Sequence, residues 1–177
     1  ANKIDMFAFF PAQSFGMALT TFVGQNIGAG KIHRVKEGLR ATMLMSVLCG
    51  IGAMVLVLTC GPNMMHLFSQ EAAVVEAGMD YLRPVMYCYL LFAIMNTVLS
   101  VLRGAGDMVF PMITSLLSLW IIRLPMAYLF SYWFGKEYIF FSYGGGWLIG
   151  MTMAIIYYFT GRWKKKAVVS KQSEEGL

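Results

Sequence analysis

Residues 41–70 form an unbroken run of thirty residues without a formal charge. Four further windows, one of them interrupted by Arg123, cover residues 6–30, 84–102, 108–135 and 138–161. Soluble domains carry charge over their surface, whereas 13% of this chain is charged and 58% is apolar. A hydrocarbon core about 30 Å thick takes roughly 20 apolar helical residues to cross. Each window is therefore long enough for one span, and the pattern predicts a multi-pass membrane protein.

Helices and closed barrels are the two structures that satisfy backbone groups in lipid. Barrel strands alternate apolar and polar residues, which residues 54–58 and 116–122 do not. We therefore predict an all-α integral membrane fold with five transmembrane helices. The expected spans cover about residues 6–28, 41–60, 84–102, 110–131 and 144–161. They would form one bundle over residues 1–166, followed by a disordered cytoplasmic tail over residues 167–177.

Lysine and arginine predict the orientation of the bundle. If the spans alternate in direction, ten basic residues fall on one side: Lys31, Arg34, Lys36, Arg40, Arg103, Arg162, Lys164, Lys165, Lys166 and Lys171. Four fall on the other: Lys3, Arg83, Arg123 and Lys136. The side with ten should be cytoplasmic, with the C-terminus inside and the N-terminus outside. We expect such a chain to be the C-terminal part of a longer membrane protein. Membrane-flanking loops account for the net charge of +5, so nucleic acid is not an expected partner.

Polar residues inside the spans are the candidates for binding. Asn96 lies near the middle of the third span, and Gln13 and Ser14 lie beside Pro11 in the first. Their side chains could meet a substrate or a cation, or form hydrogen bonds between helices. Asp5 is a weak candidate for ion coupling, because it lies at the start of the first span.

A tight inner turn is predicted after the third span. Arg103 would complement the negative end of the incoming helix, and Asp107 would cap the outgoing one. Gly104 and Gly106 would allow the turn itself. The three cysteines and two histidines lack metal-ligand spacing, so no metal site is expected.

Several motifs resemble one family of secondary transporters. The segment FFPAQSFGMALTTFVGQNIGAGKIHR resembles the second helix of a half in the multidrug and toxic compound extrusion (MATE) family, with its basic loop. LRGAGDMVFPMITSLLSLWIIRLPMAYLF is similar to that family's turn between the fourth and fifth helices of a half. The GGGW start of the last helix is similar as well. These segments follow in the family's order and cover most of residues 6–165.

The resemblance implies twelve helices in two six-helix lobes, of which this chain would be most of the C-terminal lobe. It implies a secondary active antiporter in the plasma (inner) membrane that exports cationic or amphipathic small molecules. A sodium or proton gradient would drive export, with no other cofactor. The expected partners are the remaining helices of the transporter, membrane lipid and drug-like substrates.

The resemblance also points to polar residues of the third span. Some members of the family carry an acid in the corresponding helix, whereas this chain has Tyr87, Asn96 and Thr97 as candidates there. Spans two to five contain no Asp or Glu. A coupling carboxylate is therefore expected in the rest of the transporter. A flippase for lipid-linked saccharides and a non-transporting membrane scaffold are the alternatives, and an enzyme is not expected because no nucleophile–base pair lies at membrane depth.

Overall fold

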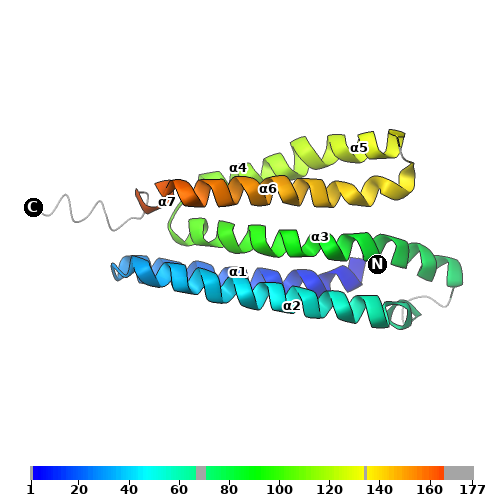
Figure 1. The fold of residues 1–177 in the computed structure, drawn as a ribbon, viewed down its shortest axis with the longest axis horizontal. Helices are drawn as coiled ribbons and strands as arrows, with labels where there is room; N and C mark the ends of the chain where they lie inside the picture. The colour runs from blue at the N-terminus through cyan, green and yellow to red at the C-terminus, as the bar shows by residue number, and fades with distance from the viewer. Residues whose placement is uncertain (1, 67–70, 134, 166–177) are drawn as a thin grey trace, which may run out of the picture.

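The computed structural model describes residues 2–66, 71–133 and 135–165, and helices with short turns make up this part of the chain. The elements are α1 (Asn2–Gly28), α2 (Ile32–His66), α3 (Ala72–Gly104), α4 (Val109–Leu116), the π-helix η1 (Leu117–Arg123), α5 (Leu124–Trp133), the 3₁₀ turn η2 (Lys136–Phe140), α6 (Phe141–Thr160) and α7 (Arg162–Lys165) (Figure 1). The prediction of an all-α membrane fold is confirmed.

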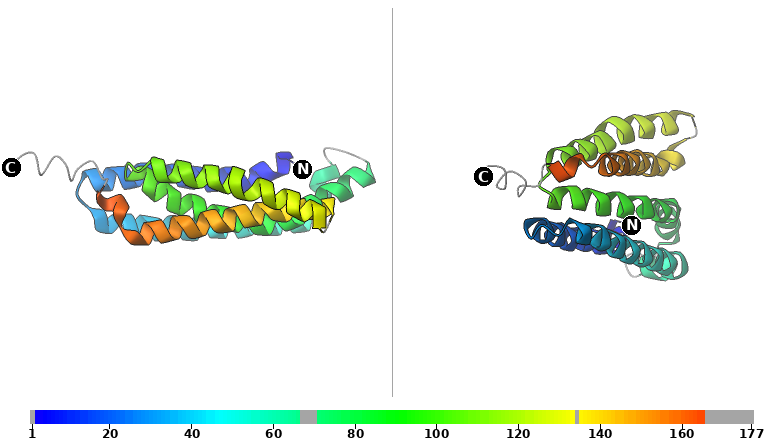
Figure 2. Two further views of the ribbon diagram at one scale, coloured as in Figure 1. Left: turned by 90° about the horizontal axis from the view of Figure 1, so that it is seen from above. Right: turned by 60° about the vertical axis from the view of Figure 1, so that its left-hand side comes forward.

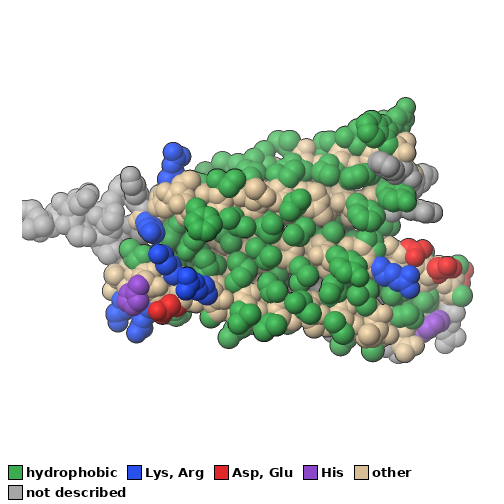
Figure 3. Space-filling view, in the orientation of Figure 1, with side chains coloured by type: hydrophobic (Ala, Val, Ile, Leu, Met, Phe, Trp, Pro, Cys, Tyr) green, Lys and Arg blue, Asp and Glu red, His purple; other side chains and the backbone are tan. Residues whose placement is uncertain are grey.

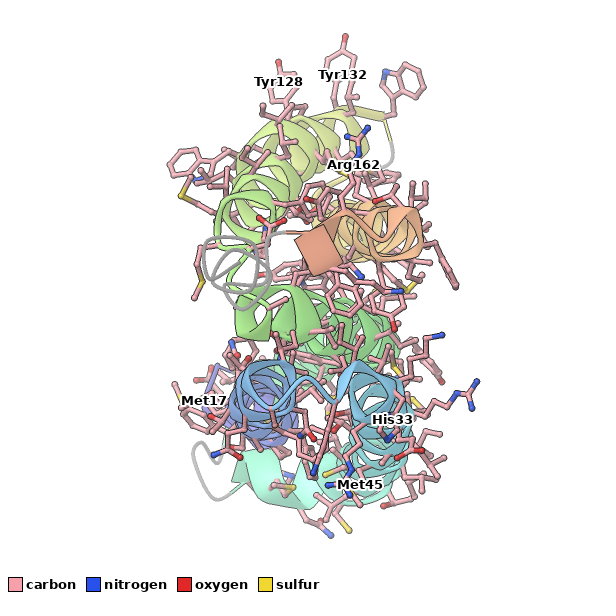
Figure 4. All side chains as sticks on the ribbon, turned by 90° about the vertical axis from the view of Figure 1, so that its left-hand side faces the viewer. Met17, His33, Met45, Tyr128, Tyr132 and Arg162 are labelled. Carbon is pink, nitrogen blue, oxygen red and sulfur yellow. The ribbon has the colours of Figure 1, made fainter. Side chains whose placement is uncertain are left out.

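The helices run back and forth along one long axis, and α3 lies at the centre of the bundle. It packs against α1 and α2 on one side and against α6 on the other. The further views agree on this layering (Figure 2). Seen from one end, α1 and α2 form one group and α4 to α6 form the other, with α3 between them (Figure 4). As a result, 16 of the 33 residues of α3 are buried.

Charged side chains gather at the two ends of the bundle, and apolar ones cover its length (Figure 3). Lysines and arginines cluster where α2 begins and α7 ends, and the acidic residues Glu76 and Asp80 lie at the opposite end, where α3 begins. Large apolar side chains such as Leu48, Trp120 and Phe159 are exposed along the sides. This distribution fits a bundle surrounded by hydrocarbon.

Within the described residues, four helices are long and apolar enough to cross a membrane: Ile32–His66, Ala72–Gly104, Val109–Trp133 and Tyr138–Thr160. The first expected span forms α1, which is 27 residues long but is not among these four. That α1 crosses the membrane is still a prediction, supported by its packing against α2 and α3.

Helix α2 extends beyond its expected span at both ends. The basic segment 31–40 is continuous with the second span in α2, because no glycine or proline separates Leu39 from Met43. The same helix continues through Pro62 to His66, although the Gly-Pro-Asn sequence predicts a turn. Pro62 removes one backbone bond, to the carbonyl of Leu58. The expected tail lies outside the described residues from residue 166 onward.

The far end of α2 packs against α3 through glycines paired with methionines. The Sδ atom of Met79 would lie 2.8 Å from a Cβ at Gly61, and the Met65 side chain fills the space beside Gly78. Both methionines are almost fully buried. This reciprocal fit extends α2 past Pro62, because the helix gains buried contact there.

Candidate functional site

Helices α1 and α3 meet along a seam of small and polar residues, each spaced by four along its helix. The seam consists of Gly16, Thr20 and Gly24 on α1 and Asn96, Ser100 and Gly104 on α3. The Thr20 hydroxyl lies 2.9 Å from the carbonyl oxygen of Gly16 and 3.2 Å from that of Ser100. A Cβ at Gly104 would lie 2.5 Å from the Thr20 carbonyl oxygen. Small residues thus bring the two backbones close, as in other membrane helix pairs.

Asn96 is the polar centre of this seam. Its Nδ2 donates to the carbonyl oxygen of Ala12 over 2.9 Å, and its Oδ1 accepts from Nη1 of Arg103 over 3.3 Å. Its side chain is almost fully buried. A Cβ at Gly16 would lie 2.5 Å from Nδ2, so the absence of a side chain at Gly16 admits the amide. Asn96 therefore bridges α1 and α3.

The other sequence candidates do not gather around Asn96. The Thr97 hydroxyl is buried and donates to the carbonyl oxygen of Ala93 in its own helix, over 2.8 Å. Gln13 is half-buried, whereas Ser14 and Tyr87 are exposed. Asp5 falls in the first turns of α1, and its side chain lies outside the described part of the structure.

The turn after α3 contains Arg103, Gly104, Gly106 and Asp107. Gly106 has a φ of 86°, and the Asp107 amide donates to the carbonyl oxygen of Leu102, which closes the helix end. Asp107 Oδ1 accepts from the Phe110 amide at 3.5 Å, at the start of α4. Asp107 Oδ2 accepts from the Tyr157 hydroxyl at 2.6 Å, which ties the turn to α6.

A second group of residues lines an aromatic cleft between α3, the η1–α5 helix and α6. Two adjoining cavities form this aromatic cleft, with volumes of about 190 and 410 Å³. They share Leu119, Arg123 and Tyr143. The remaining lining residues are Phe92, Met95, Ser115, Ser118, Trp120, Leu124, Ala127, Ile139, Phe140, Ser142, Gly146 and Trp147. α4 and α6 lie close at one end of the molecule, and α5 diverges from α6 toward the other (Figure 1).

Arg123 lies at the end of the π-helix, directly before Leu124 and Pro125. Pro125 has no amide hydrogen for the carbonyl of Ile121. The π-helix ends two residues before this proline, and π-helical segments are frequent at functional sites. The guanidinium carbon of Arg123 lies 3.5 Å from the centre of the Tyr143 ring, which makes a cation–π contact between η1 and α6.

Three consecutive glycines let three different helices approach the start of α6. A Cβ at Gly144 would meet Cys88 Sγ of α3 at 2.9 Å, and one at Gly145 would meet the Met126 side chain of α5. At Gly146 it would lie 3.0 Å from the Ser118 carbonyl oxygen and 3.5 Å from Arg123 Cβ. The glycines therefore set the width of the aromatic cleft.

The aromatic wall of the cleft is built around Trp147. Its ring centre lies 5.3 Å from that of Tyr89, 5.4 Å from that of Phe92 and 5.6 Å from that of Tyr143. Such packed rings hold a rigid apolar surface. Among the described side chains that line the cleft, Arg123 is the one formal charge.

None of the sequence candidates whose side chains are described lines this cleft. The sequence signals that point to it are the arginine-leucine-proline interruption at residues 123–125 and the GGGW motif at residues 144–147. A charged residue in an apolar span is a functional candidate by default. That rule identifies Arg123, but not its stacking on Tyr143, which depends on how η1 and α6 pack.

Comparison with known proteins identifies the family. The MatE family profile matches residues 1–129. Probable multidrug resistance protein YpnP of Bacillus subtilis is 30% identical over 163 residues, which cover 92% of this chain and 37% of that protein. Probable multidrug resistance protein NorM of Thermotoga maritima is 25% identical, over 99% of this chain and 38% of that protein.

A eukaryotic relative is more distant. Multidrug and toxin extrusion protein 1 of Homo sapiens is 22% identical over 71% of this chain and 22% of that protein. No solved structure matches the chain significantly. The chain spans well under half the length of these relatives. Since the family profile covers most of its residues, the chain belongs to the MatE family, the multidrug and toxic compound extrusion family that its motifs resemble.

Proposed function

We propose that this chain forms most of the C-terminal lobe of a secondary multidrug antiporter that exports cationic or amphipathic small molecules. The observation that carries the proposal is the family match over residues 1–129 of a multi-pass helical bundle. The names of the bacterial relatives refer to multidrug resistance. Family members move their two lobes around a central site, and this chain would supply one of the moving bodies.

Each part of the structure has a role in this proposal. The aromatic cleft offers apolar contacts to an amphipathic cargo, and the Asn96 bridge keeps α1 and α3 together while the lobe moves. Residues 81–133 contain one acid, Asp107, which lies in the turn after α3. We therefore expect the carboxylate that couples transport to sodium or protons in the rest of the protein, with Asp5 as the weak candidate within this chain. That part would also provide the negative charge for cationic cargo.

The proposed location is the plasma (inner) membrane, with the basic end of the bundle in the cytoplasm. The cluster of lysines and arginines at that end supports this orientation. Tyr128 and Tyr132 project outward from α5 (Figure 4), and Trp133 is exposed at the end of the same helix. In Figure 1, α5 lies toward the end of the bundle opposite α7. Tyrosine and tryptophan favour the interface between membrane and water, so this end would lie at the outer surface.

An ethidium accumulation assay tests the proposal. The intact protein, expressed in cells without other efflux pumps, should lower steady-state ethidium severalfold. Asn96→Ala should raise accumulation toward that of empty cells, because the α1–α3 bridge is lost. Gly52→Ala is the control, since a Cβ there meets open space. Collapsing the sodium and proton gradients separately identifies the coupling ion. Unchanged ethidium levels with the intact, correctly inserted protein would contradict the proposal.

A further inference from the structure

Arg123 carries a charge well inside the apolar part of the molecule. It lies ten residues before the end of the helical span Val109–Trp133. At 1.5 Å per residue this places it about 15 Å along the helix from that end. A charged side chain at such depth is costly unless it is paired or reaches water. The guanidinium therefore needs a partner.

Within the described part of the chain, the Arg123 guanidinium stacks on one aromatic ring and has no hydrogen-bond acceptor. The guanidinium stacks on the Tyr143 ring, and within the described residues its N–H groups donate no hydrogen bond. The carboxylates with described side chains are Glu37, Glu71, Glu76, Asp80 and Asp107, and none of them lines the cleft. Unpaired charged donors of this kind carry a large desolvation cost.

Stacking determines which part of the guanidinium is available. An arginine has five N–H donors in one plane, arranged to match a carboxylate or phosphate with two parallel hydrogen bonds. Tyr143 covers a face of that plane and leaves its edge. The edge therefore suits a planar anion, and the ring fixes the orientation in advance, which lowers the entropy lost on binding.

The surroundings of Arg123 suit an apolar, aromatic body attached to that anion. Trp147 and Phe92 lie on the α3–α6 side of the cleft, and Trp120 and Phe140 lie on the side toward η2. A cation would be repelled by Arg123 and would find the Tyr143 face already occupied. The cleft is thus complementary to an anion and not to a cation.

We propose that the aromatic cleft binds a molecule with an apolar aromatic body and one anionic group, which Arg123 meets edge-on. The proposal rests on the proposed export function, since it adds an anionic substrate class to that of the cationic cargo. A carboxylate on a solute and the phosphate of an anionic lipid share the required chemistry. The experiment below separates these two sources.

Binding is measured on the intact transporter in phosphatidylcholine nanodiscs, by calorimetry and without any ion gradient. The probes are 1-naphthaleneacetate, its methyl ester and 1-naphthaleneethylamine. The acid should bind at least ~10-fold more tightly than the ester, because it adds a charge-assisted pair. The amine should bind more weakly than the ester. Equal affinity for acid and ester would overturn the proposal.

Variants of Arg123 identify its role. Arg123→Gln should weaken acid binding at least ~10-fold and change ester binding less than about twofold. Arg123→Lys keeps the charge and should retain part of the preference for the acid. Arg83→Gln is the control, because Arg83 lines a separate cavity at the α2–α3 end. Retained ester binding shows that the Gln variant still folds. A Gln variant that keeps its preference for the acid would sink the proposal.

Lipid competition and transport complete the test. Nanodiscs with added phosphatidylglycerol should weaken acid binding in an Arg123-dependent way if a lipid phosphate uses the site. If the acid binds equally in both membranes, the site takes solutes. Loss of ethidium export with the acid preference intact would refute the proposed function alone, whereas export without an acid preference would refute this inference alone.

Discussion

At the scale of single residues, the α1–α3 seam depends on Gly104, where the backbone of α1 leaves no room for a side chain. Gly104→Ala would place a Cβ 2.5 Å from the backbone oxygen of Thr20 and 2.7 Å from Val23 Cβ. A backbone atom cannot move aside as a flexible side chain can, so the helices must separate. We expect a loss of about 1–3 kcal/mol in unfolding free energy.

Gly52→Ala is the matched control for this substitution, because a Cβ added at Gly52 would have no atom within 4 Å among the described residues. Alanine has the higher helix propensity, so this variant should be neutral or up to about 1 kcal/mol more stable. Thermal unfolding in detergent compares the two. Equal melting temperatures for both variants would show that the seam is looser than described.

Neighbouring polar residues on α3 should differ in their effect on stability. Asn96→Ala removes the only described side-chain link from α3 to the Ala12 carbonyl and should cost about 0.6–2 kcal/mol. Thr97→Val removes a bond within one helix, to Ala93, and should cost less. Thermal unfolding and proteolysis of the two variants measure the difference. A larger cost for Thr97→Val would contradict the bridging role of Asn96.

At the scale of elements, the π-helix η1 is expected to depend on Pro125. Pro125→Ala gives the Ile121 carbonyl an α-helical donor, so unfolding free energy should rise by about 1 kcal/mol. The regained α-helical turn would rotate Arg123 relative to Tyr143 and weaken binding of 1-naphthaleneacetate in the cleft. Higher stability together with weaker binding is the expected result.

Pro111→Ala provides the comparison for this change. Pro111 lies in the first turn of α4, where an amide has no partner inside the helix. Replacing it should bring no gain in stability. If Pro111→Ala and Pro125→Ala stabilise equally, the missing hydrogen bond is not the reason for the π-helix.

At the scale of the whole molecule, the separation of charges predicts which residues face each side of the membrane. Lys36 and Glu76 lie at opposite ends of the bundle. In an intact protein without its native cysteines, Glu76→Cys should react with an impermeant maleimide added outside. Lys36→Cys should react only after the membrane is opened. Reaction of both from the outside would refute the proposed orientation.

The sequence predicts the class of fold well because lipid leaves few choices. Uncharged windows indicate helices, and the charges at Lys36 and Glu76 indicate opposite ends. Helix limits were less predictable. Pro62 predicts a turn, but the fit of Met79 against Gly61 carries α2 through it. The turn preference of this sequence competes there with the packing of α2 against α3. The packing cannot be predicted without knowing which helix lies beside α2.

The candidate sites also depend on contacts between helices, which the local sequence does not reveal. Polarity along one span singles out Asn96, but its bond to Ala12 needs the α1–α3 pairing. Polarity cannot reveal the aromatic cleft, whose lining comes from three separated stretches of the chain, residues 92–95, 115–127 and 139–147. The charge of Arg123 and the glycines at the start of α6 are visible in the sequence. Their combination becomes visible once Gly146 is seen beside Arg123.

The central position of α3 has a consequence for how this chain can change over generations. Its side chains fit against three neighbours of the same chain, so an altered residue there must be matched by a second alteration elsewhere. On the outward side of α2, one apolar residue can replace another without a compensating change elsewhere. Amino-acid substitutions should therefore be more frequent in α2 than in α3.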